Sequence, residues 1–218
     1  VSHDLRAPLR AMAGFSQALI EDYGQQIPDQ GQVYLRQIDI ASRKMGELID
    51  GLLALSRTTR GEMQYDEVDL SAMSLRLLAE LQAGDPQRRV AATVQPGLQV
   101  YGDARMLETL MRNLLGNAWK YTSKVADGEI RVYRQDQDGR QRFCVADNGA
   151  GFDMAHANRL FNVFQRLHRQ DEFPGTGIGL ATVDRIVRRH GGDIEATAEP
   201  GKGAVFCFSL TYQGREGG

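Results

Sequence analysis

The sequence lacks three things: an excess of one charge, a long apolar run, and a set of cysteines large enough for a disulfide scaffold. Its 218 residues carry 26 basic and 28 acidic side chains, a net charge of −2, which argues against a general nucleic-acid or membrane-surface role. No apolar run reaches the length of a membrane span and no signal peptide is visible, so we expect a cytoplasmic protein without direct membrane contact. Cys144 and Cys207 both lie in strand-like apolar runs. We predict that they are buried free thiols in a reducing compartment, and their spacing indicates no metal site.

Residues 1–59 show the pattern of two long helices. Steps of four and three alternate in both, as in coiled coils and helix bundles, at Leu5, Leu9, Met12, Ser16 and Leu19 and at Tyr34, Ile38, Ala41, Met45, Leu48, Leu52 and Leu55. The link from Gly24 to Gly31 has helix breakers at both ends. One such hairpin has too little core to stand alone, so we predict a homodimer that forms a four-helix bundle. Because the chain starts in mid-helix, we interpret it as part of a longer protein.

The remaining residues predict a second domain of another class. A polar segment over residues 60–67 is interpreted as a linker, residues 68–213 as the domain and residues 214–218 as a loose tail. The patterns predict helices over 71–82, 104–121 and 180–190, and strands near 90–95, 99–101, 129–134, 142–147, 193–198 and 204–210. The last four strands form two hairpins. The fold class expected for the whole chain is α+β, with a mixed sheet that carries helices on one face.

Polar side chains line one edge of the predicted helix over 104–121. Asn113, Asn117 and Lys120 follow one another at steps of four and three, opposite an apolar stripe, and Tyr121 flanks them. Amide oxygens suit Mg²⁺, which takes few protein ligands and completes its shell with phosphate oxygens and water. A lysine one turn on suits phosphate. The alternative interpretation is a solvated polar face.

A buried strand ends in D-N-G-A-G-F, residues 147–152. Asp147 at a strand end can accept a hydrogen bond from an exocyclic amine such as that of adenine. Gly149 and Gly151 would let a flat base approach the backbone. An ordinary Asx-Gly turn is the alternative.

A second glycine-rich segment, P-G-T-G-I-G-L over residues 174–180, opens the last helix. Gly175, Gly177 and Gly179 at a helix N-terminus present free N–H groups and the positive end of the helix dipole to an anion. The segment matches neither the Walker nor the Rossmann pattern. The preceding loop, Arg166 to Pro174, is predicted to be a flexible lid.

The histidine near the start lies beside the heptad positions and is expected to face outward. A neutral imidazole is a good nucleophile toward phosphorus, and the adjacent carboxylate of Asp4 can hydrogen-bond one ring nitrogen of His3. Pro8 lacks an N–H and allows a bend one turn on. The alternative for His3 is a surface histidine. The other histidines, at 156, 168 and 190, are interpreted as surface or capping residues.

Four motifs stand in a specific order: S-H-D-L-R-A-P-L-R, N-L-L-G-N-A-W-K-Y-T, D-N-G-A-G-F and G-T-G-I-G-L-A. They resemble the H, N, G1 and G2 boxes of sensor histidine kinases, and F-N-V-F-Q-R-L resembles the F box. The run that continues from the F box into the last glycines looks most like the phytochrome-related branch. The resemblance covers nearly the whole chain and implies a dimerisation and phosphoacceptor hairpin followed by an ATP-binding domain of the GHKL type.

The resemblance also implies roles. His3 would be the phosphoacceptor and Asp4 its acid/base neighbour. ATP and Mg²⁺ would be the cofactors, with Asn117 and Asn113 at the metal. The nucleotide would contact Asn113, Asn117, Lys120, Tyr121, Asp147, Gly149, Gly151, Arg166, Gly175, Thr176, Gly177, Gly179 and Leu180.

The implied reaction is autophosphorylation of His3, then transfer to an aspartate of a response-regulator receiver domain on a separate chain. An upstream sensor domain would be missing from this chain, and no nucleic-acid partner is expected. Many relatives have Thr or Asn four residues after the histidine, where this chain has Ala7, which predicts weak phosphatase activity toward the partner. Two other interpretations are less favoured. The context of His3 argues against an ATPase of the same fold that drives conformational change. The intact set of Asn113, Asn117, Asp147 and the glycines argues against a non-catalytic dimerisation module.

Overall fold

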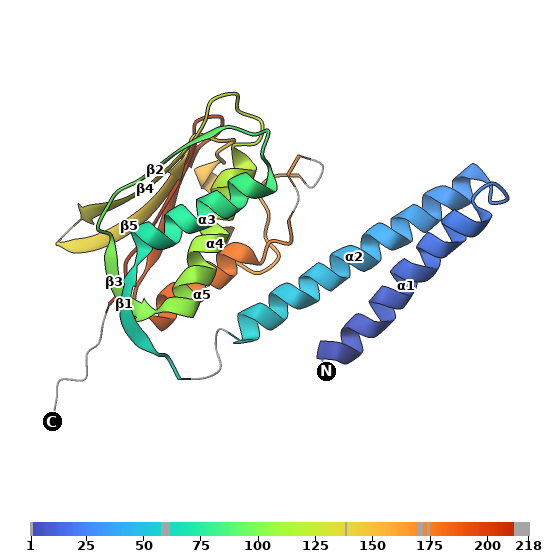
Figure 1. Ribbon diagram of the computed structural model, residues 1–218, viewed down its shortest axis with the longest axis horizontal. Helices are drawn as coiled ribbons and strands as arrows, with labels where there is room; N and C mark the ends of the chain where they lie inside the picture. The colour runs from blue at the N-terminus through green and yellow to red at the C-terminus, as the bar shows by residue number, and fades with distance from the viewer. Residues whose placement is uncertain (1, 58–61, 138, 170–171, 174, 212–218) are drawn as a thin grey trace. The chain divides into compact units, whose positions relative to one another are not determined.

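The computed structural model (Figure 1) describes residues 2–57, 62–137, 139–169, 172–173 and 175–211. The chain divides into two compact units, Val1–Arg57 and Thr58–Gly218, and each is described by itself. Among the described residues, no helix is long and apolar enough to cross a membrane.

The first unit is a helical hairpin of α1 (Ser2–Tyr23) and α2 (Asp29–Arg57). Helix α1 continues through Pro8, which lacks an N–H and so leaves one backbone carbonyl of the preceding turn without a helical partner. The turn is closed by Gln32, whose Nε2 donates to the carbonyl oxygens of Gly24 and Ile27 at 2.7 and 3.3 Å. Because α2 begins at Asp29, Gly31 lies inside this helix and the loop is shorter than predicted.

The heptad positions do not all face the interior of this hairpin. Leu9 and Ser16 are buried, at 6% and 4% exposed. The large apolar side chains lie mostly outside and are 43–72% exposed, at Met12, Phe15, Leu19, Tyr23, Val33, Tyr34, Ile38, Ile40 and Met45. The hairpin therefore encloses few large side chains, Leu9 among them, and presents many others to the surroundings.

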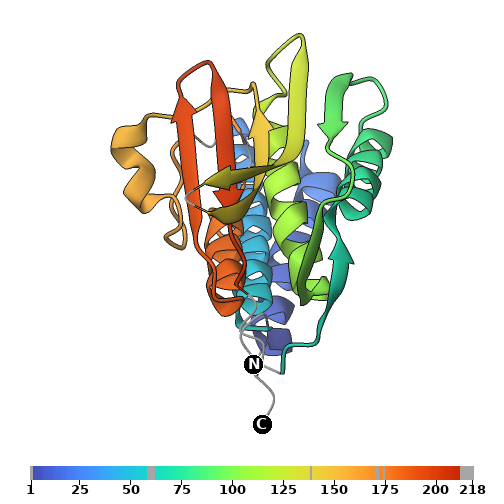
Figure 2. The ribbon, with the colours of Figure 1, turned by 90° about the vertical axis from the view of Figure 1, so that its left-hand side faces the viewer.

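The second unit contains five strands in one sheet and a separate two-stranded ribbon (Figure 2). The sheet order is β2-β4-β5-β7-β6, with β2 and β4 parallel and the other neighbours antiparallel. Helices α3, α4 and α5 cover one face of this sheet. In chain order the elements are β1 (Tyr65–Asp69), α3 (Leu70–Gly84), β2 (Val90–Val94), β3 (Gln99–Asp103), α4 (Ala104–Tyr121), β4 (Gly128–Gln137), β5 (Arg140–Asp147), the 3-10 helix η1 (Met154–Arg159), α5 (Gly179–Arg189), β6 (Ile194–Glu199) and β7 (Gly203–Phe208). The predicted mixed sheet with helices on one face is confirmed.

One strand was not predicted. Strand β1 begins at Tyr65, within residues interpreted as linker, and pairs antiparallel with β3 in the two-stranded ribbon. Only Val68 of its five residues is buried, so the segment has no apolar alternation and its sequence is typical of a polar connection.

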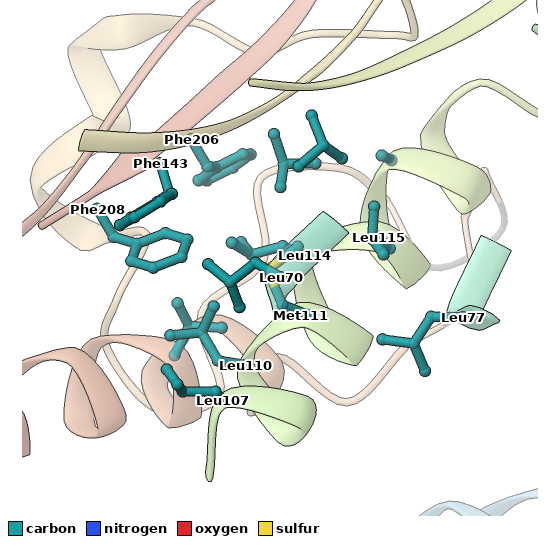
Figure 3. Packing of buried hydrophobic residues seen from close by; sticks show 14 of the residues in the cluster. Leu70, Leu77, Leu107, Leu110, Met111, Leu114, Leu115, Phe143, Phe206 and Phe208 are labelled. Atoms are coloured by element: carbon teal, nitrogen blue, oxygen red, sulfur yellow. The ribbon is translucent and has the colours of Figure 1, made fainter. Parts of the chain in front are cut away.

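The core lies between α4 and the sheet (Figure 3). Phe143, Phe206 and Phe208 come from neighbouring strands β5 and β7 and point toward the helix layer. The stripe that meets them on α4 repeats at steps of three and four, and each member is at most 1% exposed: Leu107, Leu110, Met111 and Leu114. Because the apolar stripe of α4 faces the sheet, its polar edge is left to line a pocket.

The prediction of free cysteines was wrong. Cys144 and Cys207 face each other across β5 and β7 and form a disulfide, with their Cα atoms 4.1 Å apart. Both are buried, as predicted. The pairing was not visible in the sequence, because 63 positions separate the two residues and only the strand order makes them neighbours.

Candidate nucleotide-binding site

The polar edge of α4 forms one wall of a pocket in the second unit. Asn113, Asn117, Lys120 and Tyr121 all line it. The Nδ2 of Asn113 donates to the carbonyl oxygen of Thr109 at 2.7 Å, which leaves its Oδ1 for other partners. Within the described part of the chain, the Asn117 amide makes no hydrogen bond to protein. Two amide oxygens are thus available on one helix edge.

These residues fit a divalent cation that also binds a phosphate ligand. The described residues contain no group of three or more His, Cys, Asp or Glu side chains that could hold a metal ion. A cation here would therefore take one or two amide oxygens from α4 and complete its shell with phosphate oxygens and water. Mg²⁺ takes few protein oxygens and keeps several phosphate and water ligands, and this donor set fits that arrangement.

Asp147 also lines the pocket, at the residue where β5 ends. Its Oδ1 accepts a hydrogen bond from the backbone N–H of Gly149 at 2.9 Å. Burial raises the pKa of Asp147 to about 6, against the opposing effect of backbone N–H donors. The side chain is therefore mostly a carboxylate at neutral pH and can accept a hydrogen bond from an amine.

The backbone leaves no room for side chains at the two glycines beside it. A Cβ at Gly149 would lie 2.5 Å from the carbonyl oxygen of Tyr121, and one at Gly151 would lie 2.0 Å from that of Glu199. Gly151 also has φ +58° and lines the pocket. Gly149 is not among the lining residues; its N–H orients Asp147 instead.

Two cationic side chains line the same pocket. Lys120 and Arg166 are both lining residues, and burial together with the nearby Arg166 guanidinium lowers the pKa of Lys120 to about 8. The ammonium lies 4.3 Å from the centre of the Tyr121 ring. Burial also raises the pKa of Tyr121, so its phenol stays neutral. The pair of cations suits an anion.

The second glycine segment packs closely against α4 and the preceding loop. A Cβ at Gly179, the first residue of α5, would lie 2.6 Å from the Oδ1 of Asn113. Gly177 has φ +73°, and its carbonyl oxygen accepts from the N–H of Phe164 at 2.9 Å. Gly175, Gly177, Gly179, Thr176 and Leu180 all line the pocket. Glycine is needed at positions 177 and 179, because the backbone there lies too close to the preceding loop and to α4 for a side chain.

The described part of the predicted lid makes specific contacts. Arg166 donates through Nη1 to the carbonyl oxygen of Gly175 at 2.8 Å and through Nη2 to that of Phe173. Phe173 itself is 4% exposed. Pro174 lies outside the described residues. In this structure the Arg166 guanidinium therefore binds its own loop, from within the pocket.

The two residues assigned to phosphoacceptor chemistry belong to the first unit. His3 and Asp4 lie in α1, but their side chains are outside what the structure describes, as are those of the neighbouring Leu5 and Arg6. Ala7 is exposed on the same helix.

Several lining residues carried no signal by themselves in the sequence. The apolar ones are Phe152, Leu160, Leu167, Ala204 and Phe206, and the polar ones are Gln165 and His168. Phe152 directly follows the D-N-G-A-G run and could have been included on that ground. Ala204 and Phe206 enter only because β7 pairs with β5 beside Asp147.

Two of the three other histidines, His156 and His190, lie where the interpretation as surface or capping residues put them. His156 is exposed, as predicted. His190 occupies the C-cap of α5 but is 1% exposed; its Nε2 accepts from the N–H of Asp103 at 3.0 Å and its Nδ1 donates to the carbonyl oxygen of Ile186 at 2.8 Å. His168 lines the pocket.

Comparisons with known proteins agree with this arrangement. Residues 102–214 match the family model of the histidine kinase-, DNA gyrase B-, and HSP90-like ATPases, and residues 1–61 match the His Kinase A (phospho-acceptor) domain. Cyanobacterial phytochrome B of a Nostoc species is 34% identical over 212 residues, 96% of this chain and 28% of that protein. The phosphate regulon sensor protein PhoR of Pseudomonas aeruginosa is 31% identical, over 94% of this chain and 47% of that protein.

Among solved structures, full-length ShkA in complex with AMPPNP matches with a TM-score of 0.64 at 27% identity, over 96% of this chain and 44% of that one. The chain spans less than half of each of these three proteins. A phospho-acceptor domain followed by an ATPase-type domain runs through almost its entire length. The chain therefore belongs to the sensor histidine kinases, the family of protein-histidine kinases, of which it represents a catalytic core.

Proposed function

We propose that this core uses Mg-ATP to phosphorylate His3 and then passes the phosphoryl group to an aspartate of a response-regulator receiver domain. The observation that carries the proposal is the set of charged side chains that line one pocket. Asp147 offers a carboxylate to an amine, and Lys120 and Arg166 offer positive charge to phosphates. That ShkA was crystallised with AMPPNP, an ATP analogue, supports ATP as the ligand.

The chain's own residues would bind and orient the nucleotide. Asp147 would accept a hydrogen bond from the adenine amine, and the closely packed glycines 175, 177 and 179 would let backbone N–H groups approach the phosphates. Lys120 would neutralise phosphate charge. Asn117, with Asn113 beside it, would hold Mg²⁺, which when bound supplies further charge neutralisation to the phosphates.

The acceptor step belongs to His3. A neutral imidazole nitrogen would attack the γ-phosphorus of ATP, so that an N–P bond forms, the bond from phosphorus to the β,γ-bridging oxygen breaks, and ADP leaves. Asp4 would take the proton from the other ring nitrogen or hold it by a hydrogen bond. Transfer to the receiver then breaks the N–P bond and forms an acyl phosphate on its aspartate, and the proton held by Asp4 returns to the ring, so that His3 is again a neutral imidazole.

The exposed apolar side chains of the hairpin support a homodimer. On α1, the steps between Met12, Phe15 and Leu19 are three and four residues. On α2, the steps between Tyr34, Ile38 and Met45 are four and seven, which also keeps them on one face. A second copy would bury them in a four-helix bundle. The expected location remains the cytoplasm.

The test is incubation with ATP labelled at the γ-phosphate, followed by acid and base treatment of the protein. Wild type should acquire an acid-labile label, and His3→Ala should acquire none. Asn117→Ala should lose at least about 100-fold in labelling, because a metal ligand is removed from a phosphoryl-transfer site. His156→Ala, which changes an exposed histidine outside the pocket, is the matched control and should label normally.

Other outcomes would contradict the proposal in different ways. Label that persists in His3→Ala would refute the assigned acceptor. ATP hydrolysis without any label would favour an ATPase of the same fold. Release of phosphate from a phosphorylated receiver, with kinase and ADP present, should be weak, because Ala7 cannot hydrogen-bond a water molecule through its side chain; strong release would contradict that expectation.

A further inference from the structure

His168 makes a partly buried contact that the nucleotide chemistry above does not use. Its Nε2 lies 2.7 Å from the carbonyl oxygen of Gly151. A carbonyl can only accept, so Nε2 carries the proton and donates it. Both residues line the nucleotide pocket, and Gly151 is itself buried. This hydrogen bond joins the loop after the F-box segment to the loop that follows Asp147.

The Gly151 segment is fixed from two other sides. The N–H of Ala150 donates to the carbonyl oxygen of Tyr121 at the end of α4, at 3.1 Å, and the carbonyl oxygen of Ala150 accepts from Gly201 at 2.8 Å. The carbonyl of Gly151 has no partner other than His168 among the described residues. Removing the imidazole would leave a buried acceptor unpaired, at the position where the backbone must adopt φ +58°.

The imidazole is also held in place by rings. Its centroid lies 5.1 Å from that of Tyr121 and 5.1 Å from that of Phe173, and Tyr121 and Phe173 are 5.0 Å apart. The ammonium of Lys124 lies 4.6 Å from the centre of the Phe173 ring. Three rings from two segments thus form a closed triangle beside the pocket. This packing limits the rotamers of His168 and aims its Nε2 at Gly151.

We infer that His168 is a positioning residue for nucleotide binding: its N–H holds the Gly151 carbonyl and thereby keeps the loop after Asp147 in the shape that accepts the base. The inference rests on the proposed function, since it takes ATP as the ligand. His168 would act by holding the loop after Asp147 and would not contact the phosphates. The affinity for ATP should therefore depend on the hydrogen-bond donor, whereas the rate of phosphoryl transfer at saturating ATP should not.

Two variants separate the donor from the ring. His168→Gln places an amide N–H at the position of Nε2 without a ring, and His168→Phe keeps a ring of similar size without a donor. His168→Phe should raise both the Kd and the KM for ATP by about three- to tenfold, the range expected for one hydrogen bond, with kcat changed less than about twofold. His168→Gln should stay within about twofold of wild type. His156→Phe, on exposed η1, should change nothing.

A second readout does not need nucleotide binding. Hydrogen–deuterium exchange of the amides over residues 149–153, measured without nucleotide, should be faster in His168→Phe and near wild type in His168→Gln. Unchanged exchange and affinity in His168→Phe would overturn the inference, and so would His168→Gln as weak as His168→Phe. A wild-type protein that neither binds ATP nor labels His3 would instead refute the proposed function, and the exchange data would still decide whether His168 holds the loop.

Discussion

The two units differ in where their large apolar side chains lie: buried in the second unit and mostly exposed in the hairpin. In the second unit, Phe208 and Leu110 are 0% exposed, and α4 and the sheet bury each other's large side chains. In the hairpin, the most buried positions include Ser16 and Ser42, at 4% and 5% exposed, while Phe15 is 72% exposed. A folded unit gains most of its stability from buried apolar area. The second unit buries that area within one chain, whereas the hairpin leaves much of it exposed and would need another surface to cover it.

The largest effect should therefore come from an exposed residue. Phe15→Glu places a charge on the apolar face of α1 and should abolish the dimer, because a charge buried in a bundle interface has no partner. The isolated hairpin should then lose its helical content as well. Sedimentation velocity and circular dichroism on residues 1–61 measure both. Ser16→Ala is the matched control one residue away: it changes a buried position, yet should leave the dimer intact.

Buried positions are usually the more sensitive to substitution. For Phe15→Glu and Ser16→Ala we expect the reverse, with the larger effect at the exposed position. If Phe15→Glu stayed dimeric at micromolar concentration, the exposed apolar face would not be the interface. A dimer lost in Ser16→Ala but kept in Phe15→Glu would place the contact on the opposite side of the hairpin.

In the second unit the usual expectation should hold. Leu110→Ala removes a side chain that is 0% exposed between α4 and the sheet and should lower the free energy of unfolding by about 2–5 kcal/mol. Leu75→Ala on α3, where the leucine is 57% exposed, should cost less than about 0.5 kcal/mol. Urea unfolding of a fragment that spans residues 62–218 gives both values. Equal losses in the two variants would falsify the placement of the core.

The same contrast explains what could be predicted from the sequence. The predicted bounds of α4 agree with the structure, because its apolar stripe and polar edge repeat at helical spacing from Ala104 to Tyr121. The hairpin helices were predicted for the same kind of reason. The heptad pattern could not show which positions face the other helix of the hairpin and which face outward, because a helix in a bundle has both kinds of apolar neighbour.

The pocket was predictable only where a motif lies on one element. The α4 edge and Asp147 were found because each stands at a fixed place on its helix or strand. Phe206 and the Cys144–Cys207 disulfide depend on the pairing of β5 with β7, which no local pattern encodes. His168 gave no signal because its partner is a backbone carbonyl, which every residue possesses.

The smallest predicted effect is a difference between the two units in their response to pH. ATP binding should weaken below about pH 6, because the pKa of Asp147 is raised to about 6 and the protonated acid no longer accepts from the adenine amine as a carboxylate does. It should also weaken above about pH 8, where Lys120 loses its charge. The expected change is about tenfold per pH unit at most, since a single proton is involved on each side. The proposed dimer contact of the hairpin rests on apolar side chains and should not change over the same range.

Two substitutions assign the limbs of this profile. Lys120→Arg should remove the alkaline limb, because a guanidinium stays protonated well above pH 8, and Asp147→Asn should flatten the acidic limb while weakening binding overall. Isothermal titration with ATP between pH 5 and pH 9 measures the profile, and the proton uptake of the nucleotide itself is the same for every variant and cancels in the comparison. An alkaline limb that survives in Lys120→Arg would mean that another group titrates there. The positive charge in the pocket would then depend on a residue other than Lys120, and the phosphate-binding role would have to be reassigned.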